Sequence, residues 1–206
     1  DDSSSWQLRR LNNIHPGKSI EVSQDNLPND FPSDATPFFF LYPEKLPEKL
    51  DRLIVSDHMN TEPNWRANIR LSSPTTSTSY QGEYPGEMIG IPKGSLFSFG
   101  PLAQAEPGLA TKFIFINLKA EPGSDSFKIR FAQMNNRKIL LETEVYRNRC
   151  TVIDVSGLAC DGSSPFCAIS DDLTGIPIYL THDADFKKMS FEHTHAPMEI
   201  LVFGDR

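Results

Sequence analysis

The amino-acid sequence predicts an all-β protein with little helix, an antiparallel β-sandwich of the jelly-roll-like or immunoglobulin-like (Ig-like) kind. The 16 prolines and 12 glycines among 206 residues disfavour long helices, because an interior proline removes a donor and clashes with the preceding turn. Short segments of alternating apolar and polar residues recur along the chain, as strands require. Four Pro-Gly pairs supply turn residues for joining antiparallel strands, at 16–17, 85–86, 107–108 and 122–123.

The first part of the chain is expected to hold a polar N-terminal segment and then the first strands of the sandwich. Residues 1–36 are polar and rich in proline, with one candidate strand at Ser19–Ser23, and residues 37–206 are assigned to the sandwich. Leucines within Pro43–Asp57 lie at helical spacing, so we expect one helical turn there and then a strand. The Ser/Thr run Ser73–Ser79 is either an exposed edge strand or a loop. Further strands are expected at Phe38–Tyr42, Ala67–Ser72, Glu87–Ile91 and Leu96–Gly100.

The clearest buried strand is Lys112–Lys119, whose four central residues (FIFI) are apolar on both faces, so both faces should be covered. Phe127–Phe131 alternates apolar and charged residues, and Asn135–Asn136 suits a two-residue turn before an antiparallel return over Lys138–Tyr146. A boundary near residues 121–126 would divide the chain into two packed β-domains, and a single sandwich fits the pattern equally well. The last strands are expected at Thr151–Val155, Ile176–Leu180, Met189–His193 and Met198–Phe203.

A long Ser/Asp/Gly loop is expected after Gly157, and it contains two of the three cysteines. Cys160 and Cys167 enclose a turn-rich stretch that a disulfide can close, as in proteins made in oxidising compartments. The alternative is three free thiols, with Cys150 buried as a small hydrophobe. The spacing of the three cysteines matches no zinc motif.

Charge and hydropathy restrict the partners and the location. The formal net charge of −7 disfavours nucleic acid and anionic membrane surfaces. No apolar run approaches the ~20 residues that a transmembrane helix needs. The chain opens with Asp1-Asp2 and three serines rather than Met, which fits a processed start or a domain boundary. We therefore expect an extracytoplasmic protein: secreted, periplasmic or on the cell surface.

Histidines concentrate near the end of the chain. His193 and His195 are two residues apart, so in a strand they point to one face and can chelate one divalent metal ion, with Glu199 as third ligand and His182 as a further candidate. Residues 193–199, HTHAPME, resemble the first metal motif of the cupins, in which two histidines and a glutamate hold a metal. The glycine that cupins carry before the first histidine is absent here. The alternative is a half-buried sheet face whose histidines are hydrogen-bonded and hold no metal.

A second candidate site is aromatic and polar. Trp65, Tyr80 and Tyr84 are accompanied by Asn64 and Arg66, and flat rings with neighbouring amides suit sugar recognition or protein contacts. The alternative is that Trp65 and the tyrosines belong to the core.

No catalytic motif is present: the sequence has neither a Gly-x-Ser-x-Gly elbow nor a Gly-x-x-x-x-Gly-Lys phosphate loop. The sequence therefore favours a non-catalytic extracytoplasmic module that binds a glycan or a surface or envelope protein and needs no cofactor. The alternatives are a metal-dependent, cupin-like enzyme built on the His-x-His…Glu set and a structural module of a larger exported assembly.

Overall fold

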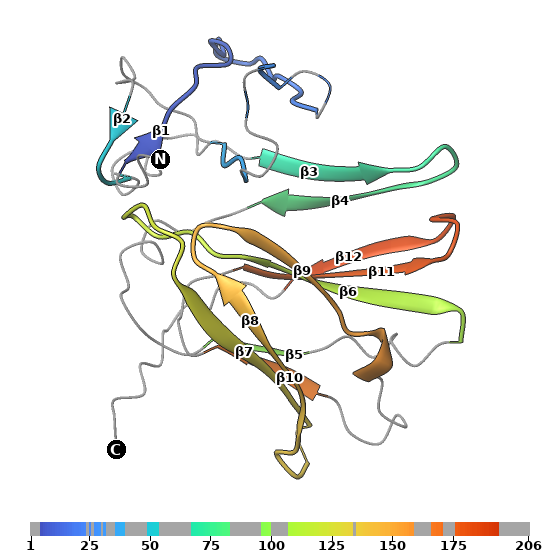
Figure 1. Ribbon diagram of the computed structural model, residues 1–206. Helices are drawn as coiled ribbons and strands as arrows, with labels where there is room; N and C mark the ends of the chain where they lie inside the picture. Colours follow the sequence, from blue (N-terminus) through green and yellow to red (C-terminus); the bar gives the residue numbers. More distant parts are fainter. Residues whose placement is uncertain are drawn as a thin grey trace.

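The computed structural model describes most of the sandwich and parts of the N-terminal region (Figure 1). The described residues are 5–23, 25, 27–29, 31, 36–39, 49–53, 67–82, 96–99, 107–133, 135–158, 166–170 and 176–193. Within these ranges there is no helix long and apolar enough to cross a membrane. The predicted strands at Glu87–Ile91 and Met198–Phe203 lie outside the described residues.

Two four-stranded antiparallel sheets pack face to face, which confirms the predicted β-sandwich. Sheet I has the order β12 (Met189–His193), β11 (Ile176–Asp183), β6 (Leu109–Ile116) and β9 (Cys150–Asp154). Sheet II has the order β5 (Leu96–Phe99), β10 (Phe166–Ser170), β7 (Ser126–Gln133) and β8 (Ile139–Tyr146). The chain leaves β6 for sheet II, forms the β7–β8 hairpin and returns as β9 beside β6. Residues 121–126, where the sequence allowed a boundary, lead from β6 into β7.

Aromatic rings fill the space between the two sheets. Phe113 and Phe115 on β6 and Phe131 on β7 are fully buried. The ring of Phe113 meets the rings of Phe131 and Tyr179 in edge-on contacts, each with 5.1 Å between centroids. Removing these rings from water is the main source of stability in such a core, and the edge-on geometry adds to it.

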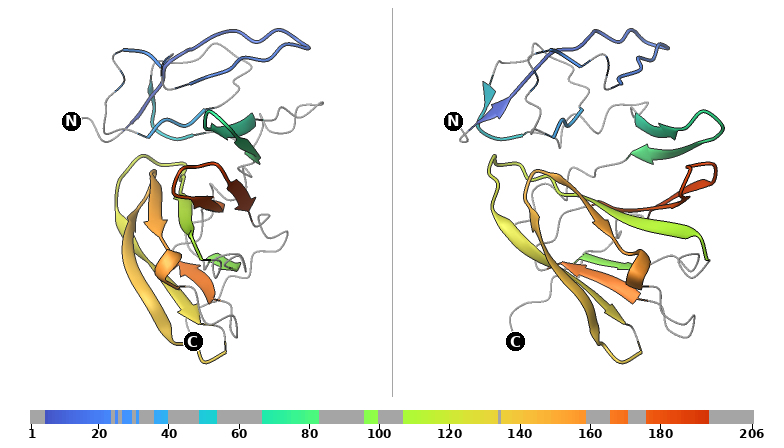
Figure 2. Two further views of the ribbon diagram at one scale, coloured as in Figure 1. Left: turned by 90° about the vertical axis from the view of Figure 1, so that its right-hand side faces the viewer. Right: turned by 45° about the vertical axis from the view of Figure 1, so that its right-hand side comes forward.

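A hairpin, β3 (Ala67–Ser72) and β4 (Ser77–Gly82), lies on the outer side of sheet I. Figure 2 shows it, in teal, beside β11 and β12, in dark red. Ile114, on the outer face of β6, packs in a cluster with Tyr80 of β4 and Ile178 of β11. Both faces of β6 are therefore covered, as its apolar sequence predicted.

The N-terminal region differs from the expectation. Trp6–Gln7 (β1) pairs with Lys49–Leu50 (β2), so this part of Pro43–Asp57 is extended and not helical. The indole of Trp6 donates to the carbonyl of Ala120 over 2.8 Å, which ties the small sheet to the sandwich. Ser19–Ser23 is irregular and not the predicted strand: it is mostly exposed, and it forms no ladder with the strands that the structure describes.

Two further expectations are corrected. The segment Phe166–Ser170, predicted as loop, is the buried strand β10, which pairs with both β5 and β7. The β7–β8 connection does turn at Asn135–Asn136, but the left-handed conformation falls on Arg137, with φ 59°. The Arg137 amide donates to the Gln133 carbonyl over 2.8 Å, so the loop is longer than the two-residue turn expected. Within the Ser/Thr run, residues 73–76 form a turn and β4 begins at residue 77.

Candidate functional site

The site residues predicted from the sequence that the structure describes belong to β11, β12 and β4. His182 lies near the end of β11, and β12 ends at His193, which pairs with Ile178. Tyr80 packs onto sheet I from β4, because it shares a cluster with Ile178. Tyr80 and the histidines His182 and His193, which are far apart in the sequence, thus lie on neighbouring strands.

β4 runs alongside β12 in the same direction. The Ser73 hydroxyl donates to the Phe186 carbonyl over 2.8 Å, and further along both strands the Phe191 amide donates to the Thr78 hydroxyl oxygen over 3.4 Å. In both bonds the two residues are 113 positions apart in the sequence, as expected when two segments run parallel in one constant register.

Three strand ends therefore come together at one end of the molecule. Ala67 at the start of β3 pairs with Gly82 at the end of β4, and the parallel course of β4 and β12 brings His193 to the same end. Candidates that directly precede or follow these ends are outside the described residues: Asn64, Trp65, Arg66, Tyr84, His195 and Glu199.

The β3–β4 hairpin presents a polar face to solvent. Residues of one face alternate along both strands and are all exposed: Asn68, Arg70, Ser72, Ser77 and Ser79. One guanidinium nitrogen of Arg70 lies 3.3 Å from Glu21, at the surface. Sequence reasoning recognised the alternation of Ala67–Ser72 as a strand and counted Asn68 among the polar residues of the aromatic candidate site, but it did not single out Arg70 or the serines of this face. The polar half of that alternation was the signal that could have found them.

Tyr80 is a buried core residue. It is 5% exposed and packs in the cluster that joins the hairpin to sheet I. The alternative role in the core, which the sequence left open, therefore describes this tyrosine, and its ring is not displayed to a ligand.

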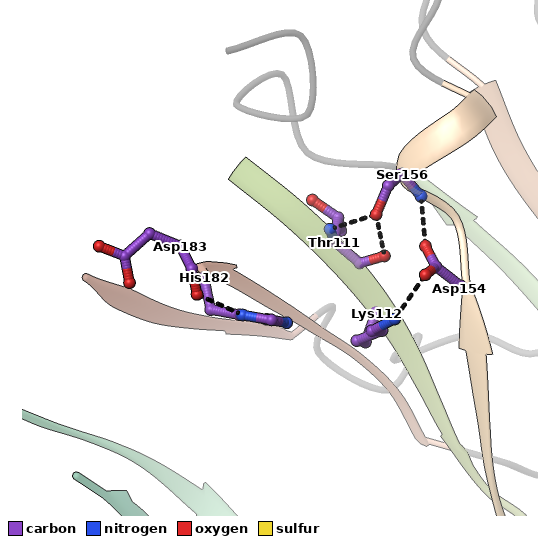
Figure 3. A network of polar contacts seen from close by, with 6 residues as sticks. All are labelled: Thr111, Lys112, Asp154, Ser156, His182 and Asp183. Carbon is purple, nitrogen blue, oxygen red and sulfur yellow. Dashed lines mark hydrogen bonds and ion pairs between the residues drawn. The ribbon is translucent and has the colours of Figure 1, made fainter. Parts of the chain in front are cut away.

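His182 belongs to the tip of the β11–β12 hairpin (Figure 3). Its Nδ1 donates to the Asp183 carbonyl over 2.8 Å, and its ring stacks on Phe186 with 4.1 Å between centroids and an interplanar angle of 6°. Backbone amides, that of Lys188 first, hold the pKa of the Asp183 carboxyl below its usual range. His193 pairs with Ile178, which comes four residues before His182 on β11. The two histidine positions are therefore about 13 Å apart along the strand direction.

The structure therefore does not bring His182 to His193. Among the described residues, no three side chains of the His, Cys, Asp or Glu type gather as metal ligands. The side chain of His193, together with His195 and Glu199, lies outside the described part, so the His-x-His…Glu metal set stays a prediction.

Thr111 and Lys112 of β6 form hydrogen bonds with Asp154 and Ser156 at the end of β9; this set of four residues is called the polar latch (Figure 3). Lys112 Nζ lies 2.5 Å from one carboxylate oxygen of Asp154. The other carboxylate oxygen accepts a hydrogen bond from the Ser156 amide over 3.0 Å. The Ser156 hydroxyl accepts from the Thr111 amide over 2.9 Å and donates to the Thr111 carbonyl over 3.4 Å. Lys112 is ion-paired, and the Ser156 hydroxyl donates its proton to a carbonyl. These two groups therefore join β6 to β9 and offer no free base or nucleophile.

The latch predicts a pH-dependent contribution to stability. The hydrogen bond from Lys112, followed by those from Ser156, holds the pKa of Asp154 well below its usual range. The stabilisation is complete above the unfolded pKa of about 4 and is lost as pH falls through the lower folded pKa. Because the pair is exposed, Asp154→Asn should lower the melting temperature at neutral pH by only about 1–3 °C. Thermal unfolding should show a smaller difference in acid, and an equal difference at both pH values would contradict this assignment.

The predicted Cys160–Cys167 disulfide is wrong. Cys167 is a free thiol, it lies within the buried strand β10 and not in the expected loop, and burial raises its pKa. Cys150 is also a free thiol, but it is exposed at the start of β9 and not buried as the alternative supposed. Cys160 lies outside the described residues.

Comparison of the chain with protein-family models, with curated proteins and with solved structures finds no match.

Proposed function

We propose that this chain is a non-catalytic, extracytoplasmic β-sandwich module that binds a glycan on the polar face of the β3–β4 hairpin. The observation that carries the proposal is the exposed row of amide, guanidinium and hydroxyl groups on that face, from Asn68 to Ser79. These groups donate and accept hydrogen bonds in the manner that sugar hydroxyls require.

The residues next to the hairpin support the same ligand class. Trp65 and Arg66 directly precede β3 in the sequence, and Tyr84 follows β4 closely. An aromatic ring can stack on the apolar face of a pyranose while its neighbours bond the hydroxyls. A binding site of this kind needs neither a metal nor a catalytic group.

A glycan array followed by calorimetric titration of the best ligand tests the proposal. Trp65→Ala and Asn68→Ala should each weaken binding about tenfold or more, since each removes a stacking surface or a hydrogen bond to the ligand. Lys138→Ala, an exposed change at the β7–β8 connection, serves as the control and should bind normally. Asn68 is exposed, so its variant keeps the test valid if Trp65→Ala fails to fold. A blank array, or full affinity in both variants, would contradict the glycan proposal.

A further inference from the structure

The chain contains three basic doublets, which are pairs of adjacent basic residues: Arg9-Arg10, Arg137-Lys138 and Lys187-Lys188. All six residues are exposed. Proteases with acidic pockets bind such side chains, as the aspartate in the specificity pocket of trypsin binds an arginine or a lysine. Residue type and exposure are therefore similar at the three doublets, and the conformation of the backbone distinguishes them.

Arg137-Lys138 lies in the tight connection between β7 and β8. The Arg137 amide donates to the Gln133 carbonyl over 2.8 Å, and the Gln133 amide donates to the Lys138 carbonyl over 2.8 Å. Arg137 has a left-handed φ of 59°. An extended peptide is bound through main-chain hydrogen bonds along its length, so a protease can bind this doublet only after the turn has opened.

Lys187-Lys188 is held in the same manner at the turn between β11 and β12. The amides of Lys187 and Lys188 both donate to one carboxylate oxygen of Asp183, over 2.7 and 3.1 Å. The Asp183 amide donates to the Lys188 carbonyl over 3.2 Å. This doublet also needs local opening of a hairpin before its backbone can fit an active site.

Arg9-Arg10 lies in an irregular segment that follows β1, drawn in blue in Figure 2. Residues 8–15 belong to no strand, helix or turn, and residues 12–14 are exposed. Among the described residues, no backbone hydrogen bond joins residues 10–14 to another part of the chain. The peptide groups on the C-terminal side of this doublet are therefore available to a protease without any opening step.

The side chains of this doublet make only local hydrogen bonds among those that the structure describes. Arg10 donates to the side-chain oxygen of Asn13, and Arg9 donates to the carbonyl of Leu8 over 3.2 Å. Both bonds are exposed. Water replaces exposed hydrogen bonds at little cost, so the guanidinium groups can leave these partners for an acidic pocket.

We propose that Arg9-Arg10 is a processing site, at which a protease specific for basic doublets hydrolyses the peptide bond between Arg10 and Leu11. One water molecule is consumed. Its oxygen completes the new carboxylate of Arg10, and its two hydrogens complete the new ammonium group of Leu11. The inference involves no ligand of the β3–β4 hairpin, so it stands or falls independently of the glycan proposal.

The cut would separate β1 from the chain that follows and leave the sandwich intact. In chain order, the first strand of the two large sheets is β5, which begins at Leu96. Three described contacts would still hold β1: its ladder with β2, the edge-on contact of Trp6 with Phe38 and the indole hydrogen bond to Ala120. Cleavage therefore turns β1 from a covalently linked element into one that is held by non-covalent contacts.

Limited proteolysis of the folded chain with a serine protease specific for basic doublets tests the proposal. Synthetic peptides that span each doublet give its intrinsic cleavage rate, which corrects for the sequence preference of the protease. After this correction, the folded chain should be cut after Arg10 at least about tenfold faster than at either hairpin doublet, because only the hairpins must open first. Mass spectrometry should identify a product that begins with Leu11.

Two variants and one spectrum complete the test. Arg10→Gln should abolish the cut, because the acidic pocket then receives no cation, whereas Lys187→Gln is the matched control and should be cut after Arg10 at the normal rate. The cleaved protein should keep the far-ultraviolet circular dichroism of the intact chain. A folded chain that resists cleavage at Arg9-Arg10, or that is cut faster at a hairpin doublet after correction, would overturn the proposal.

Discussion

Phe113→Ala should lower the free energy of unfolding by about 4 kcal/mol, the range measured when a large ring is deleted from a close-packed core. The side chain is fully buried. Its ring contacts Phe115 of the same strand, Phe131 of sheet II and Tyr179 of β11, with centroids 6.0, 5.1 and 5.1 Å away. Since it touches both sheets, its loss leaves a cavity that neither sheet can close alone.

Urea denaturation followed by far-ultraviolet circular dichroism measures the effect. Ile139→Ala is the matched control, because Ile139 is 46% exposed and its loss should cost no more than about 0.5 kcal/mol. A domain has only about 5–15 kcal/mol of stability, so the Phe113 variant should show a clearly earlier transition. Equal transitions for the two variants would mean that Phe113 is not at the centre of the core.

Sequence reasoning located well the strands in which the pattern of apolar and polar residues matches the burial of each face. β3 and β12 begin and end where the alternation predicted. The central residues of β6 are apolar on both faces, and the structure buries Phe113 toward sheet II and packs Ile114 under the hairpin. In these segments the local pattern and the tertiary surroundings agree.

The strands that were missed carry no such pattern. β10 has the sequence FCAIS and is buried at most positions, so it does not alternate, and the Ser/Gly/Pro-rich stretch before it indicated a loop. β1 and β2 have two residues each, which is too short for any periodicity. Their pairing depends on Trp6 reaching Ala120, a contact that spans 114 residues of sequence.

The candidate site shows the same limit. The sequence predicted Tyr80 and His193 as members of two separate sites. They lie on neighbouring strands because β4 runs alongside β12, and no local sequence pattern predicts that pairing. The burial of Tyr80 is likewise set by Ile178, far along the chain. Residue type indicated which side chains could carry chemistry, and long-range packing decided which of them reach solvent.

Asn148 is a second position at which one substitution should have a large effect. It sits in the turn between β8 and β9 with a left-handed φ of 58°, which asparagine tolerates better than most residues. Its side-chain oxygen accepts from the Lys119 amide over 2.7 Å, and its side-chain nitrogen donates to the Glu121 and Gly123 carbonyls, each over 3.0 Å. One side chain therefore holds the β8–β9 turn against the β6–β7 crossover.

Two substitutions separate the hydrogen bonds of Asn148 from its backbone conformation. Asn148→Gly removes the side-chain bonds without backbone strain and should cost about 2 kcal/mol, whereas Asn148→Ala adds the left-handed penalty and should cost about 3 kcal/mol. Equilibrium denaturation in urea gives both values on one scale. If alanine proved no worse than glycine, the backbone penalty would be absent. If both variants were as stable as the unmodified chain, the side chain would not join the turn to the crossover at all, since losing three hydrogen bonds to backbone groups, two of them partly buried, should have a measurable cost.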